Sequence, residues 1–369
     1  MTDKLKVLFV RPTLGYGGAD RVTLNLLQGF DREAYSCDLA LMRAEGDFVG
    51  DLPKDVELID LKARSLWFMW PPLLKLVRSK KYDVIYSTCG GASMPMMLAL
   101  RLARFRGVSV VSERNILFPP NKSRSKRKLM LVIKKLLYKK ASWVTAVSKG
   151  VKQECESILS THPKKTIVVN NPIVNQTLTE GREAEVDHPF FNEHEQVIVA
   201  VGRFEWQKDY DTLLTAFKQV AATRKHVGLF ILGKGPLQER YENWVKEHGL
   251  SDAVCFAGFD KNPFKYMKAS DVYVLSSRHE GMPGVLIQAM ASGAACVATD
   301  CPTGPNEVIR EGENGFLVPV EDHNALAQRV GQLLDDKALN QSFRALGPAS
   351  VKNFEEKVGV QSYFDFLST

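Results

Sequence analysis

Two cations in the second half of the chain have the types and spacing to bind a diphosphate. Arg203 follows the apolar run at 197–202 directly, and Lys208 stands five residues later, just before the next helical pattern. An arginine offers phosphate oxygens a planar fork of donors, and a lysine adds a compact point charge. The alternative interpretation is that both side chains are merely solvated loop charges. This interpretation fits Lys208 alone better than it fits Arg203 and Lys208 together.

A second candidate anion site lies between a predicted strand at 271–277 and a predicted helix from about Val285 to Ser292. Backbone N–H groups at the start of a helix point outward, and the helix dipole favours negative charge there. The residues of this helix are apolar on all sides of it, so we expect the helix to be buried on all sides. Gln288, which interrupts them, must then find hydrogen-bond partners in the backbone or in a ligand.

Glycines follow two further predicted strands. In the first half, TLGYGGAD (13–20) places Gly17 and Gly18 between a strand and a helix, and in the second half LGKGP places Gly235 in a similar turn. Such glycines let backbone N–H groups approach an anion. A tight turn alone also explains them, and for Gly235 by itself we favour the turn.

The elements that must position these residues are short β-branched strands alternating with longer helical patterns. The predicted strands include KVLFV (6–10), YDVIYS (82–87), VSVVS (108–112), VIVAVG (197–202), GLFILG (228–233) and DVYVLSS (271–277). Strands alternating with helices indicate βαβ units and parallel sheets. Because each half restarts with a hydrophobic strand, a glycine-containing loop and a helix, we predict an α/β fold of two Rossmann-like domains.

The length of 369 residues also favours two domains over one core. We expect an N-terminal domain at 1–175 and a C-terminal domain at 197–369. The segment between them, 176–196, is polar, acidic and without helical or strand period, which predicts a linker. A last helix, at about 353–369, is expected to cross back and pack on the N-terminal domain.

Several other classes of protein are not favoured. The six cysteines are scattered without a C-x-x-C pair, so neither a zinc site nor a disulfide framework is indicated, and a reduced cytosol is expected. Lys4 and Lys6 lead straight into a strand, so we expect no cleavable signal. The longest uncharged stretch, 84–100, carries Ser, Thr, Gly-Gly and Pro, so we expect no membrane span.

The net charge of +7 is divided unequally between the halves. Residues 1–175 carry 30 Lys and Arg against 15 Asp and Glu, a net +15, and the remainder carries a net −8. The run NKSRSKRKLMLVIKKLLYKK (121–140) holds nine Lys or Arg, no acid, and apolar residues at helical spacing. Such a basic amphipathic helix is typical of contact with an anionic membrane surface. The basic residues expected to touch the membrane are Lys126, Arg127, Lys134 and Lys135.

Alternatives remain for these surfaces. The basic run could be the solvated face of an ordinary helix, although its charge density favours a membrane. Nucleic acid is the rival polyanion, but the sequence holds no recognisable nucleic-acid module and no basic stripe with interleaved stacking aromatics, so we expect no nucleic acid partner. The aromatic segment LWFMWPPLL (66–74) is either a second interfacial contact or part of a core.

Six motifs occur in order along nearly the whole chain: GGADRV, GRFEWQK, LGKGPLQERY, SSRHEGMPGVLIQAMASG, ATDCPTGPNEVI and ENGFLV. Together they resemble glycosyltransferase family 4, retaining enzymes with the GT-B fold. Their combination is specific although each motif alone is not. The resemblance implies two Rossmann-like domains facing each other across a cleft, a nucleotide sugar held by the C-terminal domain, and no metal or cofactor requirement.

The resemblance also implies roles for individual residues. Arg203 and Lys208 would hold the donor diphosphate, and Glu280 would contact hydroxyls of the transferred sugar; these three are the expected catalytic residues. The expected donor-binding residues are Gly17, Gly18, Gly202, Gly235, Gly281, Met282, Pro283, Gly284 and Gln288.

Gln288 departs from the family pattern. Eight residues after the first Glu, the family usually has a second Glu that takes the ribose hydroxyls, and this chain has Gln288 instead. An amide still bridges a diol, because it accepts through oxygen and donates through nitrogen. Exchanging a charged for a neutral hydrogen bond costs about 1 kcal/mol, or several-fold in donor affinity.

A second departure follows the strand at 108–112. There the family often has a His near the reacting carbon, and this chain has Glu113, Arg114 and Asn115, a pattern similar to subfamilies that act on lipid-linked oligosaccharides. These residues are expected to bind the acceptor or the leaving phosphate; a strand-end ion pair is the alternative for Glu113 and Arg114. Ser148, in a segment that resembles the family's cleft lining, is a further candidate donor contact.

These observations predict a bacterial-type glycosyltransferase, peripheral on the inner face of the cytoplasmic membrane. It would move a hexose or N-acetylhexosamine from a UDP-sugar to a lipid-linked or polysaccharide acceptor in cell-surface glycan biosynthesis. Two alternatives share the fold: a nucleotide-sugar epimerase, and a catalytically silent nucleotide-sugar-binding partner in a polysaccharide assembly complex. The residues do not decide between UDP and GDP.

Overall fold

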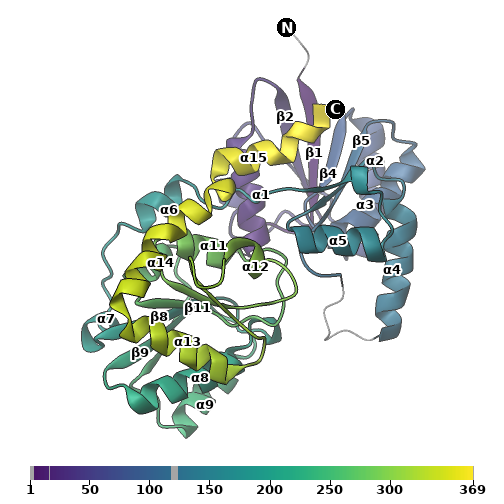
Figure 1. Cartoon of the computed structure of the whole chain (residues 1–369). Coiled ribbons are helices and arrows are strands. Elements are labelled where there is room, and N and C mark those ends of the chain that lie inside the picture. The colour runs from purple at the N-terminus through teal and green to yellow at the C-terminus, as the bar shows by residue number, and fades with distance from the viewer. Residues whose placement is uncertain (1–3, 16, 118–123, 369) are drawn as a thin grey trace. The chain divides into compact units, whose positions relative to one another are not determined.

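The computed structural model describes residues 4–15, 17–117 and 124–368, with the backbone alone for 124–127 and 368. The chain forms two compact units (Figure 1). The first is Met1–Pro172 together with Glu356–Thr369, and the second is Ile173–Glu355. Each unit contains a parallel sheet covered by helices, which confirms the predicted α/β fold of two Rossmann-like domains.

The first unit has a seven-stranded sheet in the order β3-β2-β1-β4-β5-β6-β7. The strands are β1 (Leu5–Arg11), β2 (Tyr35–Leu41), β3 (Glu57–Asp60), β4 (Val84–Ser87), β5 (Val108–Glu113), β6 (Trp143–Ala146) and β7 (Thr166–Val168). Val7, Leu8, Phe9 and Val10 are fully buried, as expected of a parallel strand covered on both faces. The strand order reverses between β1 and β4, so the loops after these strands lie where such sheets bind ligands.

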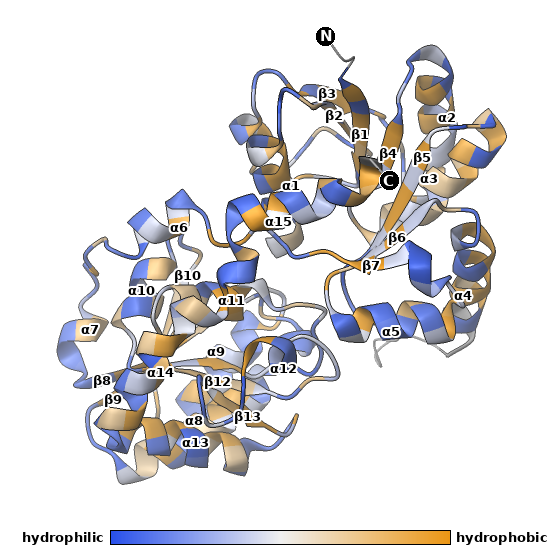
Figure 2. Cartoon of the chain, turned by 45° about the horizontal axis from the view of Figure 1, so that its top comes forward, coloured by the Kyte–Doolittle hydropathy of each residue, from blue (hydrophilic) through white to orange (hydrophobic). Residues whose placement is uncertain are grey.

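Helices cover this sheet. They are α1 (Gly18–Gly29), α2 (Trp70–Ser79), α3 (Gly90–Ala103), α4 (Arg124–Tyr138), α5 (Lys149–Ile158) and α15 (Glu356–Phe364), with 3-10 turns η1 (Val49–Asp51), η2 (Trp67–Met69), η3 (Pro163–Lys165) and η6 (Asp365–Ser368). Figure 2 shows hydrophilic and hydrophobic residues mixed along α4. In the described part of the chain, no helix combines the length and the apolar character needed to cross a membrane.

The C-terminal segment completes the core of the first unit. The ring of Phe364 lies 4.6 Å from that of Tyr35 and 6.2 Å from that of Phe9, and Tyr363 stacks on Tyr86 with centroids 5.8 Å apart. Such ring contacts add to the stabilisation that burial provides. The first unit is therefore built from two separate stretches of the sequence.

The second unit has a six-stranded sheet in the order β10-β9-β8-β11-β12-β13. The strands are β8 (Gln196–Val201), β9 (Val227–Leu232), β10 (Val254–Gly258), β11 (Val272–Leu275), β12 (Cys296–Thr299) and β13 (Phe316–Val318). The helices are α6 (Gln176–Gly181), α7 (Phe190–Glu193), α8 (Tyr210–Thr223), α9 (Gln238–Glu247), α10 (Phe264–Ala269), α11 (Gly284–Ala291), α12 (Pro305–Val308), α13 (His323–Asp335) and α14 (Lys337–Ser350), with 3-10 turns η4 (Trp206–Lys208) and η5 (Lys352–Phe354).

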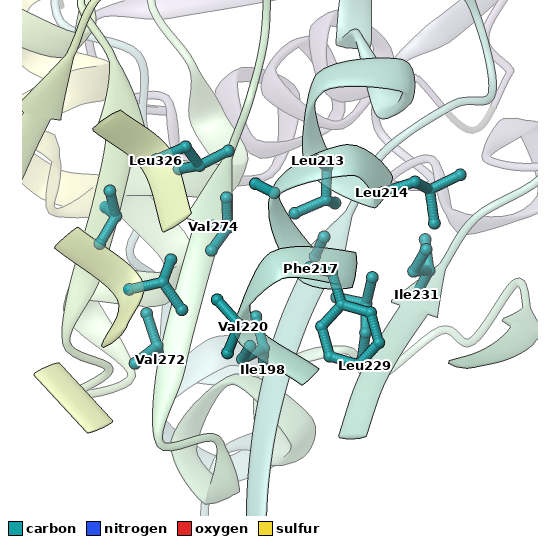
Figure 3. Packing of buried hydrophobic residues seen from close by; sticks show 14 of the residues in the cluster. Ile198, Leu213, Leu214, Phe217, Val220, Leu229, Ile231, Val272, Val274 and Leu326 are labelled. Atoms are coloured by element: carbon teal, nitrogen blue, oxygen red, sulfur yellow. The ribbon is translucent and has the colours of Figure 1, made fainter. Parts of the chain in front are cut away.

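The core of the second unit lies between its sheet and the helices that cover it. Leu213 and Phe217 of α8 pack against Ile198, Leu229 and Val274 of three neighbouring strands (Figure 3). All five side chains are at most 2% exposed. This packing fixes the ends of β8 and β11, from which the candidate site is built.

The segment expected to be a linker is part of the second unit. Residues 176–196 contain α6 and α7, and the unit boundary falls earlier, after Pro172. Leu178 and Phe190 are buried, and a Cβ at Gly228 would lie 2.6 Å from the Phe190 ring. Two apolar anchors are thus enough to dock a segment whose polar composition indicated a linker.

Candidate functional site

The predicted diphosphate residues lie where the strand order of the second unit reverses. The loop 202–209, called the β8 loop, follows β8, and the loop 276–283, called the β11 loop, follows the neighbouring β11. Beyond them the sheet continues through β9 on one side and β12 on the other. Open parallel sheets bind their ligands at this point, beside the carboxyl ends of the strands.

Lys208 and Glu280 form an ion pair between the two loops. The Nζ atom of Lys208 lies 2.6 Å from Oε1 of Glu280, which also accepts a 2.7 Å hydrogen bond from the Ser277 hydroxyl. The two charged side chains are 17% and 9% exposed, so water screens their attraction weakly. Burial lowers the pKa of the neighbouring His279, which favours its neutral form. The structure thus brings together two of the three predicted catalytic residues.

Arg203 does not share this ion pair. Its Nη1 atom lies 3.0 Å from Oε1 of Glu205, and its side chain is 54% exposed. An exposed ion pair contributes little stability, so Arg203 can exchange it for another contact at small cost. A Cβ at Gly202 would meet the Lys208 methylenes at 3.4 Å and the Tyr210 hydroxyl at 3.1 Å. The missing side chain at Gly202 therefore gives Lys208 room over the end of β8.

Helix α11 is less buried than its apolar composition predicts. Leu286 and Ile287 are buried, but Gly284, Val285 and Gln288 are half-exposed. Because residues three and four positions apart lie on the same side of a helix, Gln288 shares one half-open face with Val285 and Gly284. The structure assigns the Gln288 amide no hydrogen-bond partner among the described residues. The expected burial on all sides was wrong, and the Gln288 side chain is accessible to a ligand.

The start of α11 is held by the loop that follows β12. Thr303 donates a hydrogen bond from its hydroxyl to the carbonyl oxygen of Glu280, and Gly304, at φ 98°, lies against Pro283. Gly281 and Pro283 are buried and Met282 is half-exposed. Pro283 is the N-cap, and no side chain caps the helix there. Backbone N–H groups at this end are therefore the donors that the helix itself offers an anion.

Gly235 is explained by packing. A Cβ there would stand 2.6 Å from the backbone nitrogen and oxygen of Phe204, and one at Gly233 would stand 1.9 Å from the carbonyl oxygen of Gly202. Only glycine allows the loop after β9 to approach the β8 loop so closely. The packing of this turn therefore explains Gly235 without any contact to a nucleotide sugar. The assignment of Gly235 as a residue that binds the sugar donor gains no support from this packing.

The glycine loop before α1 rests on a buried arginine that the sequence reasoning missed. Arg11 is 4% exposed, donates a 2.7 Å hydrogen bond to the Thr23 hydroxyl and pairs with Asp20. A Cβ at Gly17 would lie 2.8 Å from Oδ2 of Asp20, whereas one at Gly18 would meet nothing within 4 Å. Packing thus explains Gly17 but not Gly18. The available signal for Arg11 was a cation that directly follows the apolar run 7–10 at the end of β1.

Glu113 and Lys134 form a buried ion pair at the carboxyl end of β5. Nζ of Lys134 lies 2.7 Å from Oε1 of Glu113, which also accepts a hydrogen bond from the Tyr138 hydroxyl. Burial, and then Glu113, raises the pKa of Tyr138 well above its usual value, so the hydroxyl stays a donor. The side chain of Lys134 is 12% exposed and faces the sheet, against its predicted membrane role. Glu113 was expected either to bind the acceptor or leaving phosphate or to form a strand-end ion pair. The structure shows an ion pair.

Three other predicted site residues have partners within the first unit. Nη2 of Arg114 donates a 2.9 Å hydrogen bond to the hydroxyl of Tyr363 in α15. Ser148 is fully buried and caps α5 by accepting a 3.2 Å hydrogen bond from the N–H of Val151. The side-chain oxygen of Asn115 accepts from the N–H of the next residue at 2.8 Å. These contacts hold α15, α5 and the end of β5. They account for Ser148 and Asn115, whereas the buried Nε of Arg114 has no hydrogen-bond partner among the described residues.

Among the described side chains of α4, several large apolar ones are exposed. Leu129, Val132 and Leu136, called the α4 stripe, are 63%, 56% and 61% exposed, and their spacing places them on one side of the helix. Lys135 is half-buried beside them. The other two predicted membrane residues, whose side chains lie outside the described part of the chain, are Lys126 and Arg127.

Both halves of the chain match models of known protein families. Residues 16–176 match the model described as Glycosyltransferase Family 4, and residues 181–348 match the model described as Glycosyl transferases group 1. The chain is 28% identical over 360 residues to the N-acetylgalactosamine-N,N'-diacetylbacillosaminyl-diphospho-undecaprenol 4-alpha-N-acetylgalactosaminyltransferase of Campylobacter jejuni, covering 93% of this chain and 94% of that one. It is 31% identical over 172 residues to the lipopolysaccharide core biosynthesis glycosyltransferase LpsD of Rhizobium meliloti, covering 46% and 49%.

Solved structures share the fold over the full length. The crystal structure of Anabaena HepE in complex with UDP and glucose matches with a TM-score of 0.81 at 20% identity, covering 99% of both chains. The apo form of the lipopolysaccharide outer core galactosyltransferase WaaB matches with a TM-score of 0.75 at 18% identity and the same coverage.

Proposed function

The chain belongs to glycosyltransferase family 4, and we propose that it moves a hexose or N-acetylhexosamine from a UDP-sugar to a lipid-linked or polysaccharide acceptor. It is a glycosyltransferase of cell-surface glycan biosynthesis, and the donor, the acceptor and the stereochemistry are the proposed part. The single observation that carries the proposal is the Lys208–Glu280 ion pair at the reversal point of the second sheet, with Arg203 on the same loop.

In this proposal the donor diphosphate takes the place of Glu280 beside Lys208. The ammonium group then faces two phosphates, and Arg203 leaves its exposed contact with Glu205 to add a second cation. Glu280 loses its ionic partner and accepts hydrogen bonds from hydroxyls of the sugar. Cations held in place before the reaction stabilise the charge that grows on the leaving diphosphate.

We further propose that the anomeric configuration is retained. The acceptor hydroxyl attacks on the face that the diphosphate leaves, and the departing phosphate removes its proton, so no protein nucleophile is needed. Gln288 bridges the ribose hydroxyls, because its amide is accessible and has both a donor and an acceptor. The reaction is proposed to need no metal, so activity should persist in excess EDTA.

The lipid-linked acceptor is supported by the Campylobacter jejuni relative, whose name gives an undecaprenol diphosphate acceptor. Membrane contact is supported by the α4 stripe, because three large apolar side chains exposed on one helix side are unusual on a monomeric surface. Lys128, near the start of α4, and Lys139 and Lys140, just after its last residue, are exposed, and they suit an anionic interface. Trp67 and Phe68, 43% and 59% exposed, offer a second contact. We therefore propose peripheral attachment to the inner face of the cytoplasmic membrane.

The test is release of UDP from UDP-sugars in the presence of extracted lipid-linked acceptors. We expect release with at least one pairing, and product analysis should show the anomeric configuration of the donor preserved. A reaction without acceptor separates transfer from epimerisation, because an epimerase converts the donor alone. If the protein binds UDP yet releases none under any pairing, the proposal of transfer is wrong. Equal binding of GDP and UDP would refute the choice of nucleotide.

A further inference from the structure

A second ion pair joins the β8 and β11 loops beside the first, with its charges reversed. Nη2 of Arg278 lies 2.6 Å from Oδ1 of Asp209. Asp209 directly follows Lys208 in the chain, and Arg278 precedes Glu280 by two residues. Each loop therefore contributes one cation and one anion. The β8 loop supplies Lys208 and Asp209, and the β11 loop supplies Arg278 and Glu280.

Asp209 is built into this contact. Its side chain is 0% exposed, and it adopts φ 50°, the left-handed region that few residues other than glycine, asparagine and aspartate visit readily. Its carboxylate also accepts a 2.7 Å hydrogen bond from the Thr212 hydroxyl and caps α8. A buried carboxylate without a cation is costly, so Arg278 is required to keep Asp209 charged in this place.

Arg278 in turn is held from several directions. Its Nε atom lies 2.6 Å from Oε1 of Glu321, its Nη1 donates to the carbonyl oxygen of Trp206 at 2.7 Å, and its guanidinium lies 4.8 Å from the centre of the Trp206 ring. The backbone N–H of Arg278 donates to the carbonyl oxygen of Gln207 at 2.8 Å. Through these contacts Arg278 holds the backbone just before Lys208, at Trp206 and Gln207. It also holds the residue just after Lys208, which is Asp209.

We propose that Arg278 and Asp209 are positioning residues, which hold Lys208 at the place where it grips the donor diphosphate. The inference rests on the proposed function, because it assumes that Lys208 meets a diphosphate. Neither residue needs to touch the donor. The carbonyl oxygen of Lys208 is fixed as well, because it accepts a 2.8 Å hydrogen bond from the Ser276 hydroxyl of the β11 loop.

Asp209→Asn separates this role from simple electrostatics. Removing a negative charge near the site raises the local positive potential, so electrostatics alone predicts tighter binding of UDP. Positioning predicts the opposite, because the amide attracts Arg278 less and the two loops separate. Asparagine also tolerates φ 50° and keeps an oxygen to cap α8, so the variant is expected to fold.

The experiment measures dissociation constants for UDP and for uridine by calorimetry. We expect Asp209→Asn to weaken UDP binding about tenfold, as for the loss of one charge-assisted hydrogen bond, with uridine changed less than about twofold. In a Lys208→Met background the same substitution should have no further effect on UDP. Arg278→Lys should recover part of the affinity that Arg278→Gln loses, because it keeps the charge for Asp209. Arg224→Gln, which breaks the Arg224–Asp335 pair of the same unit, is the matched control and should leave both constants unchanged.

Each outcome decides the inference. Unchanged or tighter UDP binding by a folded Asp209→Asn variant overturns it while leaving the proposed function intact. The inference is also overturned if Asp209→Asn weakens UDP binding equally in the unaltered protein and in the Lys208→Met background. If the unaltered protein binds neither UDP nor GDP, the proposed function fails first, and the positioning role fails with it.

Discussion

Removing Lys208 should weaken diphosphate binding in two separable steps. In Lys208→Met the methylene volume over Gly202 is largely kept, but the ammonium that contacts Glu280 at 2.6 Å is lost. A hydrogen bond to a charged group contributes about 1.5–3 kcal/mol, so the lost phosphate contact alone costs about 10- to 150-fold in UDP affinity. In addition, the 9% exposed Glu280 carboxylate is left without its cation and repels the incoming phosphates.

A second substitution measures the repulsion separately. Lys208→Met with Glu280→Gln removes both charges, so we expect it to bind UDP more tightly than Lys208→Met alone, by about 1 kcal/mol, or roughly fivefold. Isothermal titration with UDP and uridine, at two salt concentrations, measures both effects, and uridine should be bound equally by all variants. If Lys208→Met binds UDP within twofold of the unaltered protein, Lys208 does not hold the diphosphate. If the double variant gains nothing, the carboxylate of Glu280 lies too far from the phosphates to repel them.

Three further predictions concern other parts of the chain. Gln288→Glu should raise UDP-sugar affinity several-fold with little change in turnover, measured by steady-state kinetics, whereas a large gain in turnover would show that the amide cripples the enzyme. Serine at all three positions of the α4 stripe should reduce flotation with anionic vesicles and spare UDP affinity; unchanged flotation would exclude the stripe as the contact. Lys134→Met should instead leave vesicle binding intact. It should lower the free energy of unfolding, measured by urea titration, by about 3 kcal/mol, because the buried Glu113 carboxylate loses its cation. A change below about 1 kcal/mol would contradict the importance of that ion pair.

The sequence was sufficient to predict the fold and the edge of each sheet that carries the candidate site. Both follow from local patterns, because short β-branched runs reveal the strands, helical spacing reveals the helices, and parallel strands place the loops after them on one edge. Arg203 and Lys208 were found in this way, because strand ends and helix starts are local features. The role of Glu280 was predicted from the resemblance of its motif to glycosyltransferase family 4.

The contacts of charged side chains could not be predicted in the same way. Lys134 was assigned to a membrane because the sequence shows its neighbours in the helix but not Glu113, its partner across the unit. Arg114 is engaged by Tyr363, which lies 249 residues further along the chain. Asp209 and Arg278 gave no signal at all, because nothing local distinguishes a buried ion pair from two solvated charges.

The two-stretch construction of the first unit sets an order of folding during synthesis. Proteins usually fold domain by domain from the N-terminus as the ribosome releases them. Here Phe364 and Tyr363, which pack on Phe9 and Tyr86, are made after the whole of residues 173–355. At about 5–20 residues per second, the synthesis of residues 173–355 takes roughly 10–40 s, and throughout it the first unit lacks the C-terminal segment that completes its core. The unit made first is therefore the last to be finished, and in that interval the apolar surface that Tyr363 and Phe364 later cover is open to non-native contacts.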